Sequence, residues 1–246
     1  MVQCDLNCDL GEGIGNDEAI MPFISSANIA CGYHSGDENT MRKTLLLCQK
    51  YNVAIGAHPS YEDKENFGRN EVDCTVSEVY SLVKTQIISL KNIADAYHAK
   101  LHHIKPHGAL YNKAAKDEAT AKAIANAVKD VDEKLIVYGL SGSQMIREAI
   151  TIGLKTASEV FADRTYNDDG RLTPRSDAGA LIEDENKSIE QVLQMIQQGS
   201  VTSITGKKIA ITAHTISIHG DGKHAVSFAK NIHHTLVQNN IAIKAV

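Results

Sequence analysis

Short apolar runs alternate along the chain with longer segments in which apolar side chains recur at helical spacing. The short runs predict seven strands, at residues 3–8, 28–31, 53–57, 101–105, 135–139, 154–158 and 208–213. The longer segments predict six helices, at residues 37–51, 77–97, 117–131, 142–152, 188–198 and 222–238. Regular alternation of strand and helix is typical of a parallel sheet with right-handed crossover connections.

Polar clusters follow six of the predicted strands, and they discriminate between two architectures. An open, doubly wound sheet and a closed barrel both fit the alternation. In an open sheet only the strands beside the topological switch point reach the site, whereas in a barrel every carboxyl end points into one mouth. Six contributing strands favour the barrel. We expect a single domain over residues 1–246, an α/β fold built as a distorted seven-stranded (β/α) barrel that need not close completely.

Composition and charge argue against several classes of protein. The 246 residues are 43% hydrophobic, enough to form a sizeable core, and 25 basic against 30 acidic residues leave a net charge of −5. That balance argues against a nucleic-acid partner. The five cysteines are an odd number and crowd into the first third of the chain, so no disulfide framework is expected. With no signal-peptide pattern and no apolar run long enough for a membrane span, we expect a cytoplasmic protein without membrane contact.

The segment DLNCDLGEG contains the first candidate catalytic groups. Asp5, Asn7 and Asp9 stand at every second position, so on a strand all three face the same side. Polar side chains on an inward face must be paired or functional, because burying an unpaired carboxylate is costly. We predict Asp9 and Glu12 as catalytic acid or base and Asn7 as a substrate-binding residue. The role of Asp5 stays open: it is either a functional group or an anchor of the barrel floor.

Histidines end the second and third predicted strands. ANIACGYHSGD places His34 in a glycine-rich turn, and IGAHPSY places His58 directly before a proline. Imidazole groups transfer protons or ligate metals near neutral pH. We predict His58 as catalytic, and His34 together with Asn28 of the same segment as substrate-binding. Whether a metal is used stays open, with Asp9, His34 and His58 as its candidate ligands.

The segment HHIKPHGALYN ends the fourth predicted strand and has the highest density of reactive groups. Lys105 and His107 flank a proline, so both side chains can reach one pocket. A lysine can stabilise an oxyanion or bind a carboxylate, and a histidine can move a proton. We predict both residues as catalytic.

Three arginines and one further histidine complete the candidate set. Arg69 lies in a long charged loop over residues 60–70, and Arg164 and Arg175 lie in a charged insertion after the sixth predicted strand. A guanidinium group presents paired donors that suit carboxylate and phosphate groups. His219, followed by glycine and Asp221, is typical of a turn at the rim of a site. We predict Arg69, Arg164, Arg175 and His219 as substrate-binding residues.

Familiar catalytic and nucleotide-binding motifs are absent from the sequence. It contains no HExxH, no CxxC pair, no GxSxG and no GxGxxG. GSVTSITGKK superficially suggests a phosphate-binding loop, but its glycines are too far apart and no Ser or Thr follows the first lysine. If ATP takes part in the reaction, we expect another chain to hold it.

Six segments, in this order, resemble the motifs of one protein family. They span residues 5–222 and read DLNCDLGE, ANIACGYHSGD, IGAHPSY with FGR, IKPHGALYN, FADRTY with LTPR, and IHGDG. In them the chain resembles the LamB/YcsF family of 5-oxoprolinase A subunits. The resemblance implies a distorted barrel like that of the glycoside hydrolases and deacetylases. It also implies ATP-dependent ring opening of 5-oxo-L-proline (pyroglutamate) to L-glutamate, carried out with 5-oxoprolinase subunits B and C.

The candidate residues are consistent with that chemistry. A five-membered lactam is a poor electrophile, so coupling to ATP would form a phosphorylated imidate whose carbon water can attack. Asp9 or His58 would accept the water proton, and Lys105 with an arginine would stabilise negative charge. His107 or Glu12 would protonate the leaving nitrogen.

Two other functions are kept as alternatives. One is a metal-dependent carbohydrate deacetylase or a glycosidase-like hydrolase, suggested by the barrel and by Asp9, His34 and His58; tightly bound Zn²⁺ or Mn²⁺ would favour it. Only 5% aromatic residues and no tryptophan argue against a sugar-stacking cleft. The other is a non-catalytic subunit that binds a small lactam, which the number of proton-transfer groups makes less convincing.

Overall fold

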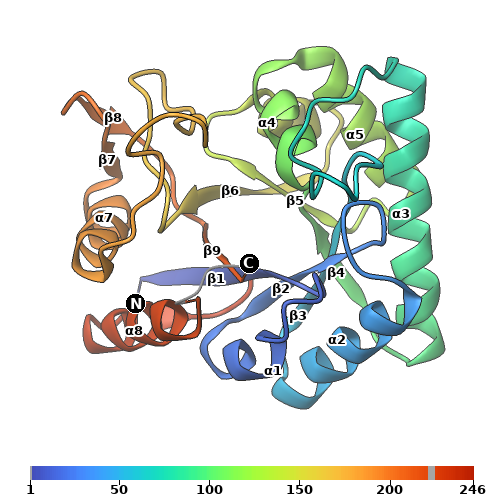
Figure 1. Ribbon diagram of the computed structural model, residues 1–246, viewed down its shortest axis with the longest axis horizontal. Helices are drawn as coiled ribbons and strands as arrows, with labels where there is room; N and C mark the ends of the chain where they lie inside the picture. The colour runs from blue at the N-terminus through green and yellow to red at the C-terminus, as the bar shows by residue number, and fades with distance from the viewer. Residues whose placement is uncertain (1, 221–224) are drawn as a thin grey trace.

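Seven parallel strands form a closed barrel at the centre of the computed structural model, which describes residues 2–220 and 225–246 (Figure 1). Neighbouring strands pair in parallel in chain order, and pairing between the first and the last closes the ring. The predicted barrel is therefore confirmed, and its closure is complete. Its strands are β1 (Gln3–Leu10), β2 (Ser26–Ala30), β3 (Ala54–His58), β4 (Leu101–Ile104), β5 (Ile136–Leu140), β6 (Lys155–Phe161) and β9 (Thr215–His219).

The predicted position of the seventh barrel strand is wrong. Residues 208–213 were expected to close the barrel, but Lys208–Ala210 forms β8, which pairs antiparallel with β7 (Ser200–Thr202) in a separate two-stranded sheet. The closing strand is TISIH, whose Thr215 and Ser217 are fully buried. Polar and apolar residues alternate along this strand, and the polar side faces the barrel interior, where Thr215 contacts Asp5 and Ser217 contacts Lys105. A short strand, β10 (Ala242–Ile243), pairs beside the start of β1.

Helices surround the barrel (Figure 1). They are α1 (Asp17–Ile20), the 3-10 helix η1 (Met21–Phe23), α2 (Glu38–Tyr51), α3 (Val76–Ala96), α4 (Gly108–Lys116), α5 (Glu118–Val131), α6 (Gln144–Thr151), α7 (Glu185–Gln198) and α8 (Ala225–Gln238). Five of the six predicted helices are present within a few residues of their expected ends, and the described part of the sixth is α8. Helices α1 and α4 were not predicted from the sequence, because both are short and follow polar turns.

The two faces of β1 show how the sequence builds the barrel. Residues 4, 6, 8 and 10 are apolar, fully or almost fully buried, and belong to the hydrophobic core shared by strands and helices. Asp5, Asn7 and Asp9 alternate with them and hydrogen-bond to residues of other barrel strands. The barrel interior is therefore polar along this strand, and the apolar core lies outside the ring of strands.

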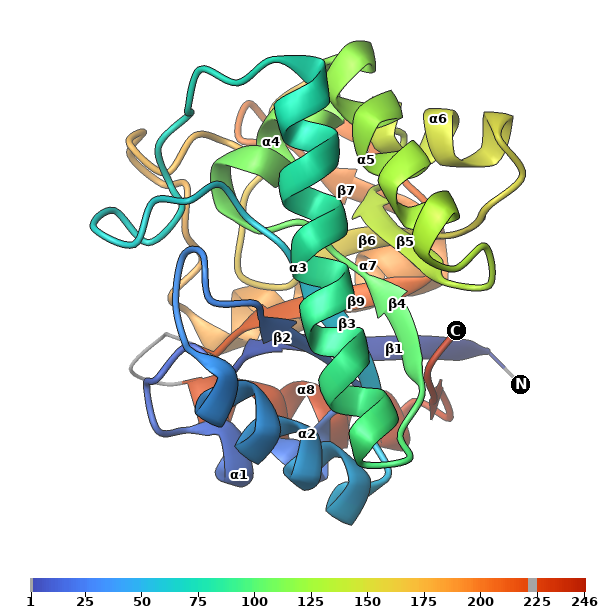
Figure 2. The same ribbon diagram turned by 90° about the vertical axis from the view of Figure 1, so that its right-hand side faces the viewer.

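The carboxyl ends of the strands open at one end of the barrel. The long loops after β2 and β3 gather on the left side of Figure 2, and both chain termini lie on the right. Among the described residues, no helix combines the length and the apolar composition that a membrane span requires.

Candidate active site at the barrel mouth

A pocket of about 340 Å³ opens at the carboxyl ends of the strands. Nine of the twelve candidate residues line it: Asp9, Glu12, His58, Arg69, Lys105, His107, Arg164, Arg175 and His219. Side chains that are up to 210 positions apart in the sequence thus line one cavity. Asn7, Asn28 and His34 do not line the pocket and contact residues that do. Asp221 lies outside the described residues.

A buried lysine forms the floor of the pocket. Lys105 Nζ lies 2.9 Å from Asp9 Oδ1 and 2.9 Å from Glu159 Oε1, and it donates to Ser217 Oγ at 2.8 Å. Burial by itself lowers the pKa of Lys105, but the two carboxylates outweigh it and raise the pKa above its usual value. The side chain is therefore a fixed cation whose charge compensates two buried carboxylates.

Asp9 carries the complementary negative charge. Besides Lys105, it accepts a hydrogen bond from Asn28 Nδ2 at 2.8 Å, and its Oδ2 lies 3.3 Å from His58 Nε2. Burial raises the pKa of Asp9, but the charges of His58 and Lys105 outweigh burial and hold its pKa well below the ordinary range. A carboxylate with so low a pKa is a weak base, so this environment suits charge stabilisation better than proton abstraction.

Asn7 and Asn28 lie below Asp9 and Lys105 and connect this charge network to the barrel. Asn28 Nδ2 donates to Asn7 Oδ1 at 2.7 Å, and Asn7 Nδ2 donates to Glu159 Oε1 at 3.0 Å. His103 Nε2 contacts Asn28 Oδ1 at 2.8 Å from β4. Both asparagines are fully buried and saturated by protein partners. They hold Asp9 and Glu159 in place, and the structure gives them no access to a substrate in the pocket.

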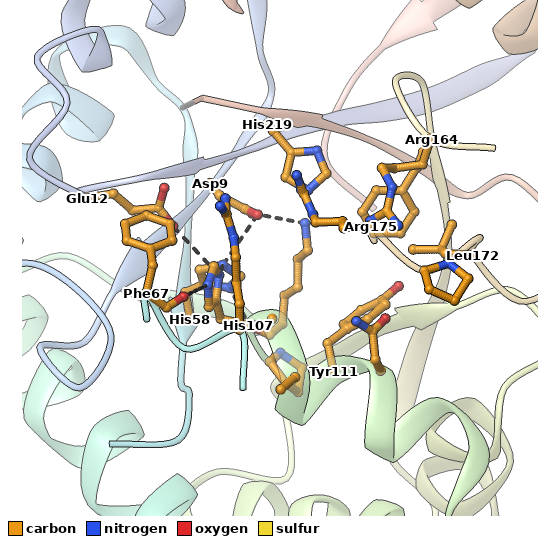
Figure 3. Close-up of a pocket in the computed structure, with 18 of the residues that line it drawn as sticks. Asp9, Glu12, His58, Phe67, His107, Tyr111, Arg164, Leu172, Arg175 and His219 are labelled. Atoms are coloured by element: carbon orange, nitrogen blue, oxygen red, sulfur yellow. Dashed lines mark hydrogen bonds and ion pairs between the residues drawn. The ribbon is translucent and has the colours of Figure 1, made fainter. Parts of the chain in front are cut away.

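Three histidines and a glutamate pack together on one side of Asp9. His58, His107 and Glu12 line the pocket there, and Figure 3 shows them on the side opposite His219, Arg164 and Arg175. His34 stacks on His107, with ring centroids 3.8 Å apart. Burial and then the neighbouring His58 lower the pKa of His34 to about 3, and burial together with His34 and His58 lowers the pKa of His107 far below its usual value. Candidate ligand atoms of Glu12, His34, His58 and His107 all lie within 4.8 Å of one another.

A histidine–aspartate pair faces this cluster across the pocket. His219 Nδ1 donates to Asp163 Oδ2 at 2.7 Å, and the imidazole stacks on Phe161. Burial raises the pKa of Asp163, but the charge of His219 and its hydrogen bond outweigh that effect and lower it. With Nδ1 bound to the carboxylate, Nε2 of His219 is the nitrogen left for a ligand. The sequence analysis assigned no role to Asp163.

Arginines form the rim. Arg164 is buried and donates from Nη2 to Thr173 O at 2.5 Å and from Nε to Ala180 O at 3.3 Å. Burial and the nearby Arg175 lower the pKa of Arg164 to about 10, so its guanidinium stays charged at neutral pH. Arg69 lies over the ring of Phe67, 5.0 Å from its centroid, on the loop before α3. The three cations make the pocket attractive to an anionic group.

Two further residues at the pocket floor escaped the sequence analysis. Glu159 on β6 shares Lys105 with Asp9, and Ser217 on β9 accepts from the same lysine. Glu159 is an acidic residue inside an otherwise weakly polar, buried strand, which is a signal that could have been used. Ser217 was hidden because its segment was not recognised as a barrel strand.

Comparisons with known proteins agree with this architecture. A solved structure described as T48 deacetylase with substrate matches with a TM-score of 0.50 at 13% identity, covering 98% of this chain and 87% of that one; this likeness concerns the fold alone. The lactam utilization protein of Thermus thermophilus matches with a TM-score of 0.93 at 38% identity over the whole of both chains.

Proteins of similar sequence also match this chain over its full length. A protein of Tolumonas auensis, named as the A subunit of 5-oxoprolinase, is 49% identical over 251 residues, which cover all of both chains. The profile of the LamB/YcsF family matches residues 4–246, from the first strand of the barrel to the last residue. Because that match includes every pocket residue described above, the chain belongs to the LamB/YcsF family.

Proposed function

We propose that this chain is the A subunit of an ATP-dependent 5-oxoprolinase, which opens 5-oxo-L-proline to L-glutamate together with subunits B and C. The observation that carries the proposal is the small pocket that is lined both by arginines and by buried acid–base groups. The names of full-length relatives support the same reaction.

The rim arginines suit the substrate carboxylate. 5-Oxoproline is a small lactam with one negative charge, and a guanidinium group offers two parallel donors to a carboxylate. Arg69 and Arg175 line the pocket, and the buried Arg164 adds positive charge beside them. We assign carboxylate binding to this group of cations.

Ring opening needs an activated carbonyl and two proton transfers. Phosphorylation of the lactam oxygen by ATP would give an imidate phosphate, and water would attack its ring carbon. The bond between that carbon and nitrogen then breaks and the nitrogen takes up a proton, which leaves an acyl phosphate on the side-chain carboxyl group of glutamate. A second water hydrolyses this acyl phosphate and releases glutamate and inorganic phosphate. We assign acceptance of the proton of the attacking water to His219, and its hydrogen bond to Asp163 supports this assignment. We assign the ATP site to a partner subunit, because the sequence has no phosphate-binding loop.

Other roles given to individual residues stay predictions. Lys105 was predicted to stabilise negative charge, yet its Nζ group already contacts Asp9, Glu159 and Ser217. Its contribution would therefore be the positive charge it keeps beneath the pocket.

Reconstitution tests the proposal. This chain is combined with candidate subunits B and C, ATP and 5-oxoproline, and glutamate and inorganic phosphate are measured together. We expect both products only when all three chains are present. Phosphate or glutamate formed equally well without this chain would refute an enzymatic role. Binding of 5-oxoproline with no turnover in the full mixture would favour the lactam-binding alternative.

A metal-dependent carbohydrate hydrolase is the second candidate, favoured by the cluster of His58, His107 and Glu12 in a deacetylase-like fold. A bound metal suits either reaction, so the substrate has to discriminate between them. Release of acetate from N-acetylated sugars by this chain alone, without ATP, would establish that candidate.

A further inference from the structure

When both rings are neutral, the nitrogen atoms that His58 and His107 turn toward each other carry no hydrogen. His58 Nδ1 lies 2.7 Å from the carbonyl oxygen of Lys105, and His107 Nε2 lies 2.9 Å from that of Phe67. A carbonyl can only accept, so each of these nitrogens must carry the proton. In neutral imidazoles this leaves lone pairs on His58 Nε2 and His107 Nδ1, which are only 2.9 Å apart. Two facing lone pairs at that distance require a cation between or beside them, either a proton on one ring or a metal ion. Asp9 Oδ2, 3.3 Å from His58 Nε2, adds negative charge that favours a cation there.

A carboxylate stands next to the same two nitrogens. Glu12 Oε1 lies 3.7 Å from His107 Nδ1, and all the candidate donor atoms of this cluster lie within 4.8 Å of one another. Ligands held 2.0 to 2.1 Å from a tetrahedral zinc ion are about 3.4 Å apart. The observed separations of 2.9 Å and 3.7 Å lie on either side of that value. Two imidazoles and a carboxylate suit zinc and similar transition metals, whereas Mg²⁺ and Ca²⁺ prefer oxygen ligands alone.

His34 belongs to the support of this site and not to its ligand set. Its ring is parallel to that of His107, with an angle of 6° and 3.8 Å between centroids. An ion bound along the lone pair of an imidazole lies in the ring plane, so two stacked rings cannot both direct their lone pairs at one ion. By contrast, the rings of His58 and His107 meet at 82° and can converge. His34 Nε2 contacts Glu12 Oε1 at 3.2 Å, its Nδ1 contacts Ser60 Oγ at 2.9 Å, and the residue does not line the pocket.

We propose that Glu12, His58 and His107 bind one divalent transition-metal ion, with Zn²⁺ as the best fit, and that His34 positions Glu12 and His107. Such an ion, with a coordination position open to the pocket, polarises a bound carbonyl or lowers the pKa of a bound water. Of the ligands expected from the sequence, this set keeps His58, places His34 in the supporting shell and leaves Asp9 paired with Lys105. It reassigns Glu12 and His107 from proton transfer to metal binding. The proposal concerns the site already described and does not depend on which substrate enters it.

Metal titration of the purified full-length chain tests the ligand set. After chelator treatment and removal of the chelator, Zn²⁺ binding is measured by calorimetry and by elemental analysis of the gel-filtered protein. We expect one ion per wild-type chain and a loss of affinity of at least about 100-fold in His58→Gln, His107→Gln and Glu12→Gln. His34→Gln and Ser60→Ala should weaken binding about 10- to 100-fold without abolishing it, as is typical of residues that orient ligands. His219→Gln, an imidazole of the same pocket outside the cluster, should bind as the wild type does.

Cobalt substitution gives a second readout that is independent of activity. Co²⁺ bound by two imidazoles and a carboxylate should produce visible absorption bands that disappear on addition of Zn²⁺ and are missing in His58→Gln. Circular dichroism of every variant verifies that the fold is retained. Equal Zn²⁺ affinity in the wild type and in a His58→Gln/His107→Gln double variant would overturn the proposal, leaving a shared proton as the cation between the two rings. Abolished binding in His34→Gln would overturn the division into ligands and support.

The outcome is separable from the enzymatic proposal. Metal binding is measured on the isolated chain without ATP, 5-oxoproline or partner subunits. A chain that binds no metal can still release glutamate in the reconstituted mixture, and a metal-binding chain can still fail to do so.

Discussion

Asp163 holds His219 by a hydrogen bond of 2.7 Å between Oδ2 and Nδ1. The two residues come from the turn after β6 and from the end of β9, which are adjacent strands of the closed barrel. The carboxylate fixes the tautomer of the imidazole, so that Nε2 is the atom left to exchange a proton with a ligand. A histidine of this kind, one edge of which lines the pocket, suits a general base better than the low-pKa carboxylate of Asp9.

Removing this imidazole should reduce the rate of the chemical step. For His219→Gln in the reconstituted mixture we expect kcat for glutamate release to fall about 10²- to 10⁴-fold, the usual contribution of a general base, with little change in KM. Asp163→Asn should give a smaller loss and a changed pH–rate profile, because the amide no longer fixes the tautomer. His233→Gln on α8, away from the pocket, is the matched control. Unchanged kcat in His219→Gln would show that the pair has no role in turnover.

Substitution of the two aspartates on the inner face of β1 should distinguish an effect on the reaction from an effect on the structure of the barrel. Asp9→Asn removes the partner of Lys105 in the pocket, and we expect glutamate release to fall at least about 100-fold because the charge arrangement at the reacting centre is lost. Asp5→Asn changes a residue on the same strand face below the pocket. There, Asp5 accepts hydrogen bonds from Ser26 at 2.8 Å and from Thr215 at 2.7 Å. That control should keep kcat within about twofold. Equal losses in both variants would mean that the effect arises from the barrel and not from the pocket.

Lys105 should be important for stability as well as for function. Lys105→Met leaves the buried carboxylates of Asp9 and Glu159 without their cation, and breaking a buried ion pair in this way costs about 3 to 5 kcal/mol. Urea unfolding measures the loss. A Lys105→Met/Glu159→Gln double variant should recover part of it, because one of the two unpaired charges is removed.

The pH dependence of this effect has a defined sign. The pKa of Lys105 is raised in the folded state, so its stabilisation is complete below the unfolded value of about 10.4 and is lost as pH rises through the folded value. The wild type should therefore lose stability at strongly alkaline pH, and Lys105→Met should lack that component. The same alkaline loss in both proteins would contradict the assignment.

Asp117 should stabilise the start of α5 only while it is ionised. Its carboxylate accepts from the backbone N–H of Thr120 at 2.7 Å, and hydrogen bonds from that residue lower the pKa of Asp117. Asp117→Ala should cost roughly 1 kcal/mol at neutral pH. This contribution is present above the unfolded pKa of about 3.9 and disappears as pH falls through the lowered folded value. Asp117→Asn keeps an acceptor without a charge, so its unfolding free energy should lack this acid-dependent loss.

Two glycines with similar backbone conformations should respond differently to alanine. Gly108 has φ of +53°, and a Cβ atom there would lie 2.4 Å from the carbonyl oxygen of Gly68, in the loop that also carries Phe67 and Arg69. Gly142 has φ of +76°, and its Cβ would meet nothing within 4 Å. Both substitutions strain the backbone by about 1 kcal/mol. Only Gly108→Ala should also raise KM for 5-oxoproline, by displacing the loop that forms the rim; a similar rise in Gly142→Ala would point to a general effect.

The class of fold and most of the pocket residues could be predicted from the sequence. Strand–helix alternation and polar residues after six strands were sufficient to predict a parallel barrel with one mouth, and nine of twelve candidate residues line the same cavity. The period-two pattern on β1 correctly placed Asp5, Asn7 and Asp9 on one face. These features are local, because side-chain direction along a strand repeats every two residues whatever the rest of the chain does.

Which atoms contact one another could be seen only in the folded chain. The closing strand at Thr215–His219, the sharing of Lys105 between Asp9 and Glu159, and the pairing of His219 with Asp163 all join residues about 50 to 210 positions apart. Periodicity shows which face a side chain occupies, but not which partner lies opposite it, because strand order, register and loop packing set those contacts. The same limit explains His34, which the sequence placed at the mouth and the fold places behind Glu12 and His107. Whether an imidazole nitrogen carries a proton depends on such neighbours, so the chemistry of the histidine cluster could be read only from the folded chain.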